Sequence, residues 1–351
     1  MIQRRFAVLA AVLVAIAAPC LANAQVYPER LTAKMKYVVA AYQRRDRDER
    51  EEQTERTTKT LRLGSNGELS LGNIAGDITV TRGGGNDATV EIVKVAKARS
   101  ADEARELLTL VTVDVSERNG RAEVKTRYPS GDENRRNNRR NFNVTITFNV
   151  TAPSGTRLNV NSVSGNIKVS DIKGEISVGT ASGNVSVTSA GAIAEAKSVS
   201  GNVEIVNAQG DDSLEASSVS GDVTMQRVSV RRIQAGSVSG NVKLEEVQCD
   251  RAEAHSTSGN ITFTGPLARR GRYELKSFSG EVHLAIAGGS GFEVDATTFS
   301  GDVRSDLPIT MRGNTDPNDR RRRRSLSGTY GDGSAILELS TFSGSIVIAK
   351  K

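Results

Sequence analysis

Tryptophan is absent from this 351-residue sequence, and Phe, Trp and Tyr together make up only 4% of it. This scarcity argues against the aromatic platforms on which many sugar-binding and single-strand nucleic-acid sites depend. Cysteine occurs only as Cys20 and Cys249, and histidine only twice, so neither a disulfide framework nor a common zinc motif is expected. The stability of the protein must therefore come from packing and backbone pairing.

Long apolar runs are also missing, apart from one near the N-terminus. Residues 1–24 have the pattern of a secretory signal: Arg4 and Arg5 carry positive charge, residues 6–18 are apolar, and small residues ending at Ala24 form a cleavage site. The apolar run is shorter than the roughly 20 residues of a membrane span. We expect cleavage near Ala24 and an extracytoplasmic protein, in the periplasm, at the cell surface or secreted. An uncleaved anchor is the alternative.

Two regions precede the main part of the chain. Residues 25–60 are predicted to be a charged helix and linker, because acids and bases alternate there with few apolar residues to form a core. A tether and a solvated leader are both consistent with this segment. Residues 61–152 are predicted to be a strand-rich region with one helix, which Ser100 caps with the help of Glu103. A hairpin is expected about Asn119–Gly120.

One phrase, Ser-Val-Ser-Gly-Asn-Val at Ser237–Val242, recurs throughout residues 153–351. Successive copies lie 18 to 21 residues apart, a period typical of a solenoid. A last copy follows an Arg-rich insert at 312–324, and an earlier relative is Asn73–Ile78. The eight regularly spaced motif glycines are Gly165, Gly183, Gly201, Gly221, Gly240, Gly259, Gly280 and Gly301.

Apolar or small residues stand seven and five positions before each glycine, and apolar ones two and four positions after it. Each repeat is therefore predicted to form two short strands of period two, joined through Ser-Gly-Asn. Glycine suits the corner conformation, and the Asn or Asp that follows should stack into a column whose amides bond to each other. The fold class is all-β: a β-solenoid of about ten coils and about 19 residues per coil, preceded by a small mixed strand and helix region.

The repeat resembles that of a bacterial putative-adhesin family of unknown function, whose envelope proteins repeat Ser-x-Ser-Gly-[Asn/Asp]-[Val/Ile]. Further matching stretches are Val144–Val150 leading into Pro153–Arg157, Gly328–Gly333, and Leu337–Ile346. The resemblance covers roughly residues 60–351. It implies a secreted β-solenoid of the envelope and brings no catalytic residues.

A column of carboxylates is a candidate cation site. These residues lie midway between the paired apolar positions and should stack on one outward face, with Gln234 interrupting the row and Glu338 extending it. Hard divalent cations prefer such oxygen ligands. The alternative is a solvated face relieved by Lys197, His255 and Lys276. The candidate residues are Glu195, Glu215, Glu253, Glu274 and Asp295.

Two basic inserts are candidate anion-binding loops, since the arginine fork pairs well with phosphate and carboxylate. The expected ligands are acidic polysaccharide, lipopolysaccharide or lipid headgroups, and the alternative is a solubilising loop. The candidate residues are Arg135, Arg136, Arg139, Arg140, Arg320, Arg321, Arg322, Arg323 and Arg324.

The sequence favours a non-catalytic scaffold or adhesin-like binding protein of the cell envelope or surface. A polyanion-binding module acting through the arginine loops is the alternative, and a carbohydrate-active enzyme on a β-helix is the third hypothesis. No enzyme is predicted, because the repeat spreads the carboxylates evenly instead of pairing them, and His255 and His283 fall on different strands. We expect no cofactor and no nucleic acid. The expected partner is an envelope component or a polyanion, with peripheral membrane contact or self-association through the solenoid end as further options.

Overall fold

The computed structural model describes residues 51–129, 143–311 and 324–351. Two units divide the chain: Met1–Glu52 with Lys97–Ala104, and Gln53–Ala96 with Arg105–Lys351. In the first unit, Lys97 and Glu52 form an ion pair of 3.0 Å.

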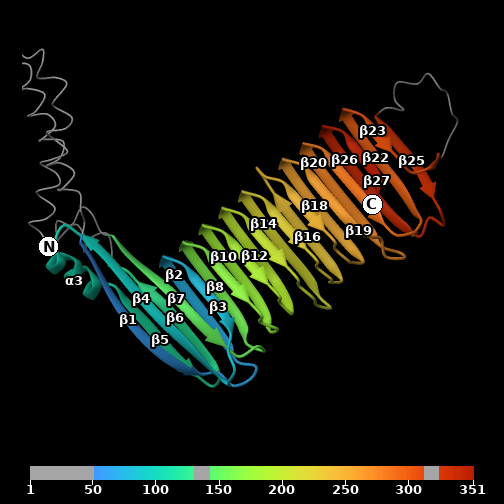
Figure 1. The fold of residues 1–351 in the computed structure, drawn as a ribbon. Coiled ribbons are helices and arrows are strands. Elements are labelled where there is room, and N and C mark those ends of the chain that lie inside the picture. Colours follow the sequence, from blue (N-terminus) through green and yellow to red (C-terminus); the bar gives the residue numbers. More distant parts are fainter. Residues whose placement is uncertain (1–50, 130–142, 312–323) are drawn as a thin grey trace, which may run out of the picture. The chain divides into compact units, whose positions relative to one another are not determined.

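Two long sheets make up almost all of the second unit (Figure 1). The first sheet has the strand order β1 (Glu51–Arg62), β4 (Asp87–Ala98), β7 (Val144–Ala152), β3 (Ile78–Arg82), β9 (Ile167–Ser170), β11 (Val185–Thr188), β13 (Val203–Val206), β15 (Val223–Gln226), β17 (Val242–Glu245), β19 (Ile261–Pro266), β21 (Val282–Ala287), β27 (Ile346–Lys350) and β23 (Val303–Ser305).

The second sheet has the strand order β24 (Thr310–Met311), β25 (Ser325–Tyr330), β22 (Phe292–Ser300), β26 (Ala335–Ser343), β20 (Arg272–Ser279), β18 (Arg251–Ser258), β16 (Arg232–Ser237), β14 (Ser213–Ser220), β12 (Ala192–Ser200), β10 (Glu175–Ser182), β8 (Arg157–Ser164), β2 (Glu68–Ala75), β6 (Arg121–Arg127) and β5 (Thr112–Arg118). Each repeat places one strand in each sheet, and equivalent strands of neighbouring coils pair in parallel. The β-solenoid prediction is confirmed.

The core lies between the two sheets and is filled by the residues that the alternation marked. In one coil Leu214, Ala216, Val223 and Met225 are all buried, while the residues between them face outward. At positions where neighbouring coils carry leucine or isoleucine, alanines such as Ala252 and Ala254 are also fully buried.

The motif glycines stack on one another across the coils. A Cβ atom on Gly240 would lie 2.1 Å from the carbonyl oxygen of Gly221, and the same clash, at 2.0–2.3 Å, recurs at every other motif glycine of the stack. Gly201 has a φ of +151°, a conformation that disfavours side chains, whereas no φ in the left-handed range occurs at Gly240. Close approach of neighbouring coils, more than corner conformation, therefore requires glycine along the column.

Two polar columns flank the glycines. The first hydroxyl of each motif is buried and, except at Ser162, donates to the glycine carbonyl of the neighbouring coil, as Ser218 Oγ does to Gly201 O at 2.8 Å. The Asn column is present, but its predicted amide-to-amide bonding is mostly replaced by another contact. Each side-chain oxygen accepts a hydrogen bond from the backbone of the next coil, as in Asn184 N to Asn166 Oδ1 at 3.0 Å. Side chain and backbone thus share the stabilisation of the stack.

The coils do not follow the chain order at the C-terminal end. Strand β26 lies between β20 and β22, and β27 lies between β21 and β23, so the last coil in sequence is inserted before the preceding one (Figure 1). Although Lys350 and Lys351 end the chain, β27 therefore does not lie at the end of the stack. Parallel pairing on both edges of β26 satisfies its backbone groups on each side, which an outermost position would leave unpaired. The antiparallel strand β25 instead follows β22 at that end.

Two predicted boundaries also need correction. Residues 51–60 belong to strand β1 and not to a helix or linker, because β4 offers a paired edge and opposite charges, including Lys94 to Glu55 at 3.6 Å. The solenoid begins before residue 153, since β2 and β3 form a coil that pairs with β8 and β9. Residues 25–50 lie outside the described part.

The predicted helix and hairpin of the N-terminal region are confirmed. Helix α3 (Ala101–Leu110) follows Ser100, whose hydroxyl accepts the backbone N–H of Glu103 at 3.3 Å. Strands β5 and β6 pair in antiparallel fashion about Asn119–Gly120, both with positive φ. In the described residues, no helix has the length and apolar character needed to cross a membrane.

Candidate functional site

The predicted carboxylate column exists in register along the second sheet. Glu195 pairs with Glu215, and Glu253 pairs with Glu274. Strand order then brings Glu338 between Glu274 and Asp295, which the linear sequence does not reveal.

Basic neighbours neutralise this column. Lys197 forms ion pairs with Glu195 and, at 2.9 Å, with Glu215, and these hydrogen bonds raise the lysine pKa. The hydrogen bond from Lys276 lowers the pKa of Glu274. Across the described ranges, no group of three or more His, Cys, Asp or Glu side chains is placed to hold a metal ion. The geometry therefore favours the interpretation of a solvated, internally paired face.

The predicted arginine loops fall almost wholly outside the described residues. Arg135, Arg136, Arg139, Arg140 and Arg320–Arg323 are all in undescribed stretches. Arg324 is described and exposed, and its carbonyl accepts a hydrogen bond of 2.7 Å from the backbone N–H of Thr298. The anion-binding prediction for these two loops stays a prediction.

Cys249 is buried, and its carbonyl accepts a 2.7 Å hydrogen bond from the hydroxyl of Tyr273. Burial raises the pKa of its thiol to about 12, so the nucleophilic thiolate is scarce at neutral pH. His255 and His283 lie on β18 and β21, which belong to different sheets. The arrangement of these three residues provides no nucleophile and base pair.

An exposed apolar ridge, which sequence reasoning missed, runs along the corner from the second sheet to the first. It consists of the residue between the two hydroxyl residues of each motif, together with Ile74 at the equivalent place between Asn73 and Ala75. Ala181 and the polar Thr257 interrupt the row of large apolar residues. The large apolar side chains are 39–63% exposed. Its large members, in order of stacking, are Ile74, Val163, Val199, Val219, Val238, Phe278, Phe342 and Phe299.

Three phenylalanines at the C-terminal end of the ridge stack in a column. The ring of Phe342 lies between those of Phe278 and Phe299, with centroid distances of 5.0 and 4.7 Å and nearly parallel planes. The signal in the sequence was phenylalanine at the same motif position in three copies. The low aromatic content of the sequence drew attention away from this signal. In addition, only the strand order shows that the three rings lie together.

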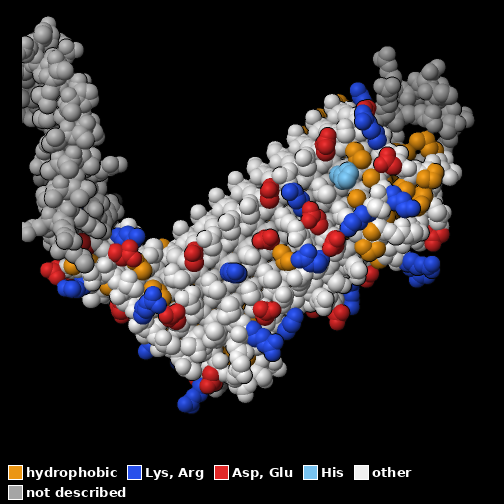
Figure 2. Space-filling view, viewed as in Figure 1, with side chains coloured by type: hydrophobic (Ala, Val, Ile, Leu, Met, Phe, Trp, Pro, Cys, Tyr) orange, Lys and Arg blue, Asp and Glu red, His pale blue; other side chains and the backbone are white. Residues whose placement is uncertain are grey.

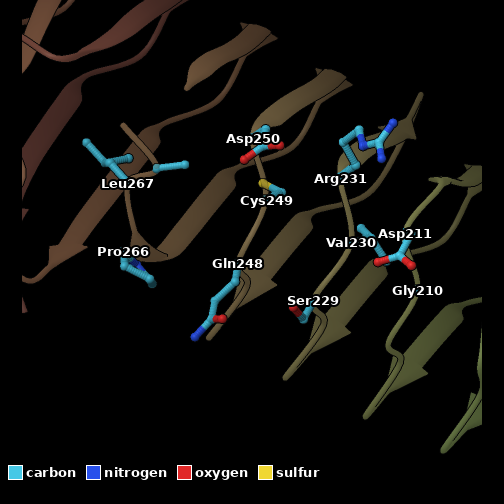
Figure 3. A pocket seen from close by; sticks show the side chains of 11 residues that line it. Gly210, Asp211, Ser229, Val230, Arg231, Gln248, Cys249, Asp250, Pro266 and Leu267 are labelled. Carbon is cyan, nitrogen blue, oxygen red and sulfur yellow. The ribbon is translucent and has the colours of Figure 1, made fainter. Parts of the chain in front are cut away.

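The opposite corner carries a groove, where the chain passes from the first sheet back to the second. One hollow of about 530 Å³ extends over four successive loops (Figure 3). Figure 3 shows Asp211, Arg231 and Asp250 on neighbouring loops beside it. A second hollow of about 420 Å³ shares these three residues and adds Arg232, Arg251, Arg270 and Arg272. We call the two hollows together the loop groove.

The visible face of the molecule shows how these surfaces differ in character. Acidic and basic side chains are interspersed along most of it, whereas hydrophobic side chains gather over the C-terminal coils (Figure 2). Alternating charge of this kind suits a solvated surface, and gathered apolar side chains suit contact with a partner.

The fold and these surfaces define a β-solenoid with repeated exposed columns. The model of one family, Toastrack DUF4097, matches residues 66–349, and the chain belongs to this family. A search of the curated proteins finds no match to the sequence.

The chain is also similar to solved structures of bacterial proteins. A putative adhesin from Bacteroides fragilis shares 15% identity over 85% of this chain and 97% of its own, with a TM-score of 0.40. A putative lipid binding protein from Parabacteroides distasonis shares 15% identity over 83% of this chain and 96% of its own, with a TM-score of 0.45. A putative cell adhesion protein from Clostridium sporogenes shares 12% identity over 86% and 100%, with a TM-score of 0.23.

Proposed function

We propose that this protein is a non-catalytic β-solenoid scaffold of the cell envelope or surface, which binds an envelope protein in the manner of an adhesin. Its N-terminal signal sequence, cleaved near Ala24, would direct it out of the cytoplasm. The observation that carries the proposal is the apolar ridge. Large exposed apolar patches on soluble proteins mark interaction sites, and the three stacked phenylalanines form the most apolar part of the ridge.

The chemistry of the ridge favours a protein over other partners. The phenylalanine rings stack face to face, with Phe342 in the middle, so they present mainly edges and offer little flat surface to a sugar. Beside the ridge, Asp222, Glu281 and Asp302 stand in the Asn column. Their charge opposes contact with an anionic membrane surface. An apolar strip on another protein satisfies both constraints.

Co-sedimentation with isolated cell envelopes tests the proposal. The wild type should sediment with untreated envelopes and stay in solution with protease-treated ones. The triple variant Phe278→Ser, Phe299→Ser and Phe342→Ser should remain in solution in both cases. The matched control is Ile336→Ser, because Ile336 is 44% exposed on β26 but lies off the ridge, and this variant should behave as wild type.

Three results would contradict the proposal. Equal sedimentation of wild type and ridge variant would show that the ridge does not bind. Undiminished binding to protease-treated envelopes would identify a lipid or glycan partner instead. If the wild type does not sediment with untreated envelopes, the proposed function is refuted.

Polyanion binding through the inserts at Arg135–Arg140 and Arg320–Arg324 is the second candidate. The exposure of Arg324 supports it. Replacement of Arg320–Arg324 by serine should then weaken binding to anionic vesicles or to lipopolysaccharide, in a salt-sensitive way. Unchanged binding by this variant would remove the candidate.

A further inference from the structure

A row of arginines borders the loop groove, on a surface separate from the apolar ridge. Arg232 pairs in register with Arg251, and Arg251 with Arg272, so three guanidinium groups stem from successive strands. Neighbouring strands of a sheet lie about 4.8 Å apart. Like charges at such spacing repel each other unless an opposite charge relieves them.

The protein itself relieves only part of this charge. Arg272 is paired with Glu338. Within residues 51–129, 143–311 and 324–351, the side chains of Arg231, Arg232 and Arg251 make no ion pair or hydrogen bond with another residue, and the same holds for Arg270. Arg231 and Arg270 are exposed, whereas Arg232 and Arg251 are half-buried.

We propose that the loop groove binds a linear acidic glycan, whose carboxylate or sulfate groups pair with Arg232, Arg251 and Arg272. The planar guanidinium forms forked, charge-assisted hydrogen bonds with such anions. The chain would lie along the solenoid axis, since the groove crosses successive coils.

The rest of the groove indicates a glycan rather than a polymer with a charge on every unit. The arginine-lined hollow carries five arginines against three aspartates, Asp211, Asp212 and Asp250. A uniformly charged polymer would place some of its anions beside these carboxylates. A glycan that alternates acidic and neutral sugars avoids this, because aspartates accept hydrogen bonds from neutral hydroxyl groups.

The neighbouring hollow adds groups suited to neutral sugars. Ser229 and Gln248 line it together with Gly210 and Asp211. Hydroxyl and amide side chains both donate and accept hydrogen bonds, as sugar hydroxyls require. The groove thus carries polar, uncharged groups beside the charged ones.

Binding measurements with defined polymers test the proposal on the purified protein. The probes are hyaluronan, which alternates a uronate with a neutral sugar, neutral dextran, and inorganic polyphosphate. We expect salt-sensitive binding of hyaluronan, no binding of dextran, and weaker binding of polyphosphate. Tighter binding of polyphosphate than of hyaluronan, or binding of dextran, would overturn the glycan assignment.

Two matched double variants locate the site. Arg232→Ser with Arg251→Ser should lower the affinity for hyaluronan at least tenfold. Lys168→Ser with Lys243→Ser removes the same charge from exposed positions on the first sheet and should change it less than twofold. Equal losses, or no loss in the arginine variant, would overturn the proposal. Unchanged melting temperatures verify folding, and the ridge variant should bind hyaluronan as wild type does, which separates this site from the proposed function.

Discussion

Replacement of Gly240 by alanine is expected to destabilise the solenoid strongly. The new Cβ atom would lie 2.1 Å from the carbonyl oxygen and 2.5 Å from the carbonyl carbon of Gly221. Ordinary contact begins at 3.4 Å, and both atoms belong to backbone, so no side chain can rotate away. The two coils must separate locally, which weakens the ladder hydrogen bonds on either side of the corner.

The magnitude follows from this forced separation. Overpacking in a well-packed interior costs about 1–3 kcal/mol, and a backbone-to-backbone clash belongs at the upper end, about 3 kcal/mol. The entropy of unfolding is about 2.1 cal/mol/K per residue, or about 0.6 kcal/mol/K for about 300 residues, so we expect a fall in melting temperature of about 5 °C.

Gly236 provides the matched control in the same coil. A Cβ atom there meets only the carbonyl oxygen of His255, at 3.9 Å. Alanine should stabilise this strand position by about 0.4–1 kcal/mol, because it restricts the unfolded chain. Thermal unfolding followed by far-ultraviolet circular dichroism measures both variants. Equal shifts in melting temperature, or a Gly240→Ala variant as stable as wild type, would refute the steric explanation of the glycine column.

Three further predictions concern single side chains. Ser218→Ala removes the side-chain hydrogen bond to Gly201 O and should cost about 1–2 kcal/mol in urea unfolding. The buried hydroxyl of Ser162 has no partner in the described residues, so Ser162→Ala should leave the free energy of unfolding unchanged. Equal losses of stability in the Ser218 and Ser162 variants would contradict the role of the hydroxyl column. Cys249 should resist alkylation in the folded protein at pH 8. Because its folded pKa, about 12, exceeds the ordinary 9.0, the stability that it contributes should be fully present below pH 9 and lost as pH rises toward 12, and Cys249→Ala should flatten this loss. Phe342→Ser should reduce the fluorescence of a bound hydrophobic dye more than Ile336→Ser does, and the reverse order would argue against an exposed ridge.

Much of the solenoid could be predicted because each coil repeats the same local sequence pattern. Leu214 and Ala216 before a motif glycine, and Val223 and Met225 after it, encode the inward face by alternation alone. The fate of Glu51–Arg62 could not be predicted in this way. Its side chains are mostly exposed, so no apolar pattern marks it, and only pairing with β4 makes it a strand.

The candidate sites likewise combine features that the sequence predicts with features that only the structure shows. The acidic column followed from the repeat register, but its neutralisation by Lys197 depends on which carboxylates the amine reaches across two strands. The loop groove was not foreseen, although Arg232, Arg251 and Arg272 each lie eight residues before a motif glycine. That position varies between coils, with Glu175 and Ser213 in two of the others, so it did not stand out as part of the motif. The register of β16, β18 and β20 shows that the three arginines lie side by side.

The sequence by itself determined the two-strand coil, the buried positions and the glycine corner, because these depend on alternation and on contacts repeated once in every coil. The tertiary structure alone decided the order of the last coils. Residues 335–350 pair with the Gly280 coil on one side and with the Gly301 coil on the other, so both edges of this last coil are satisfied in the inserted position. That insertion puts Phe342 between Phe278 and Phe299, and so it creates the stacked end of the ridge.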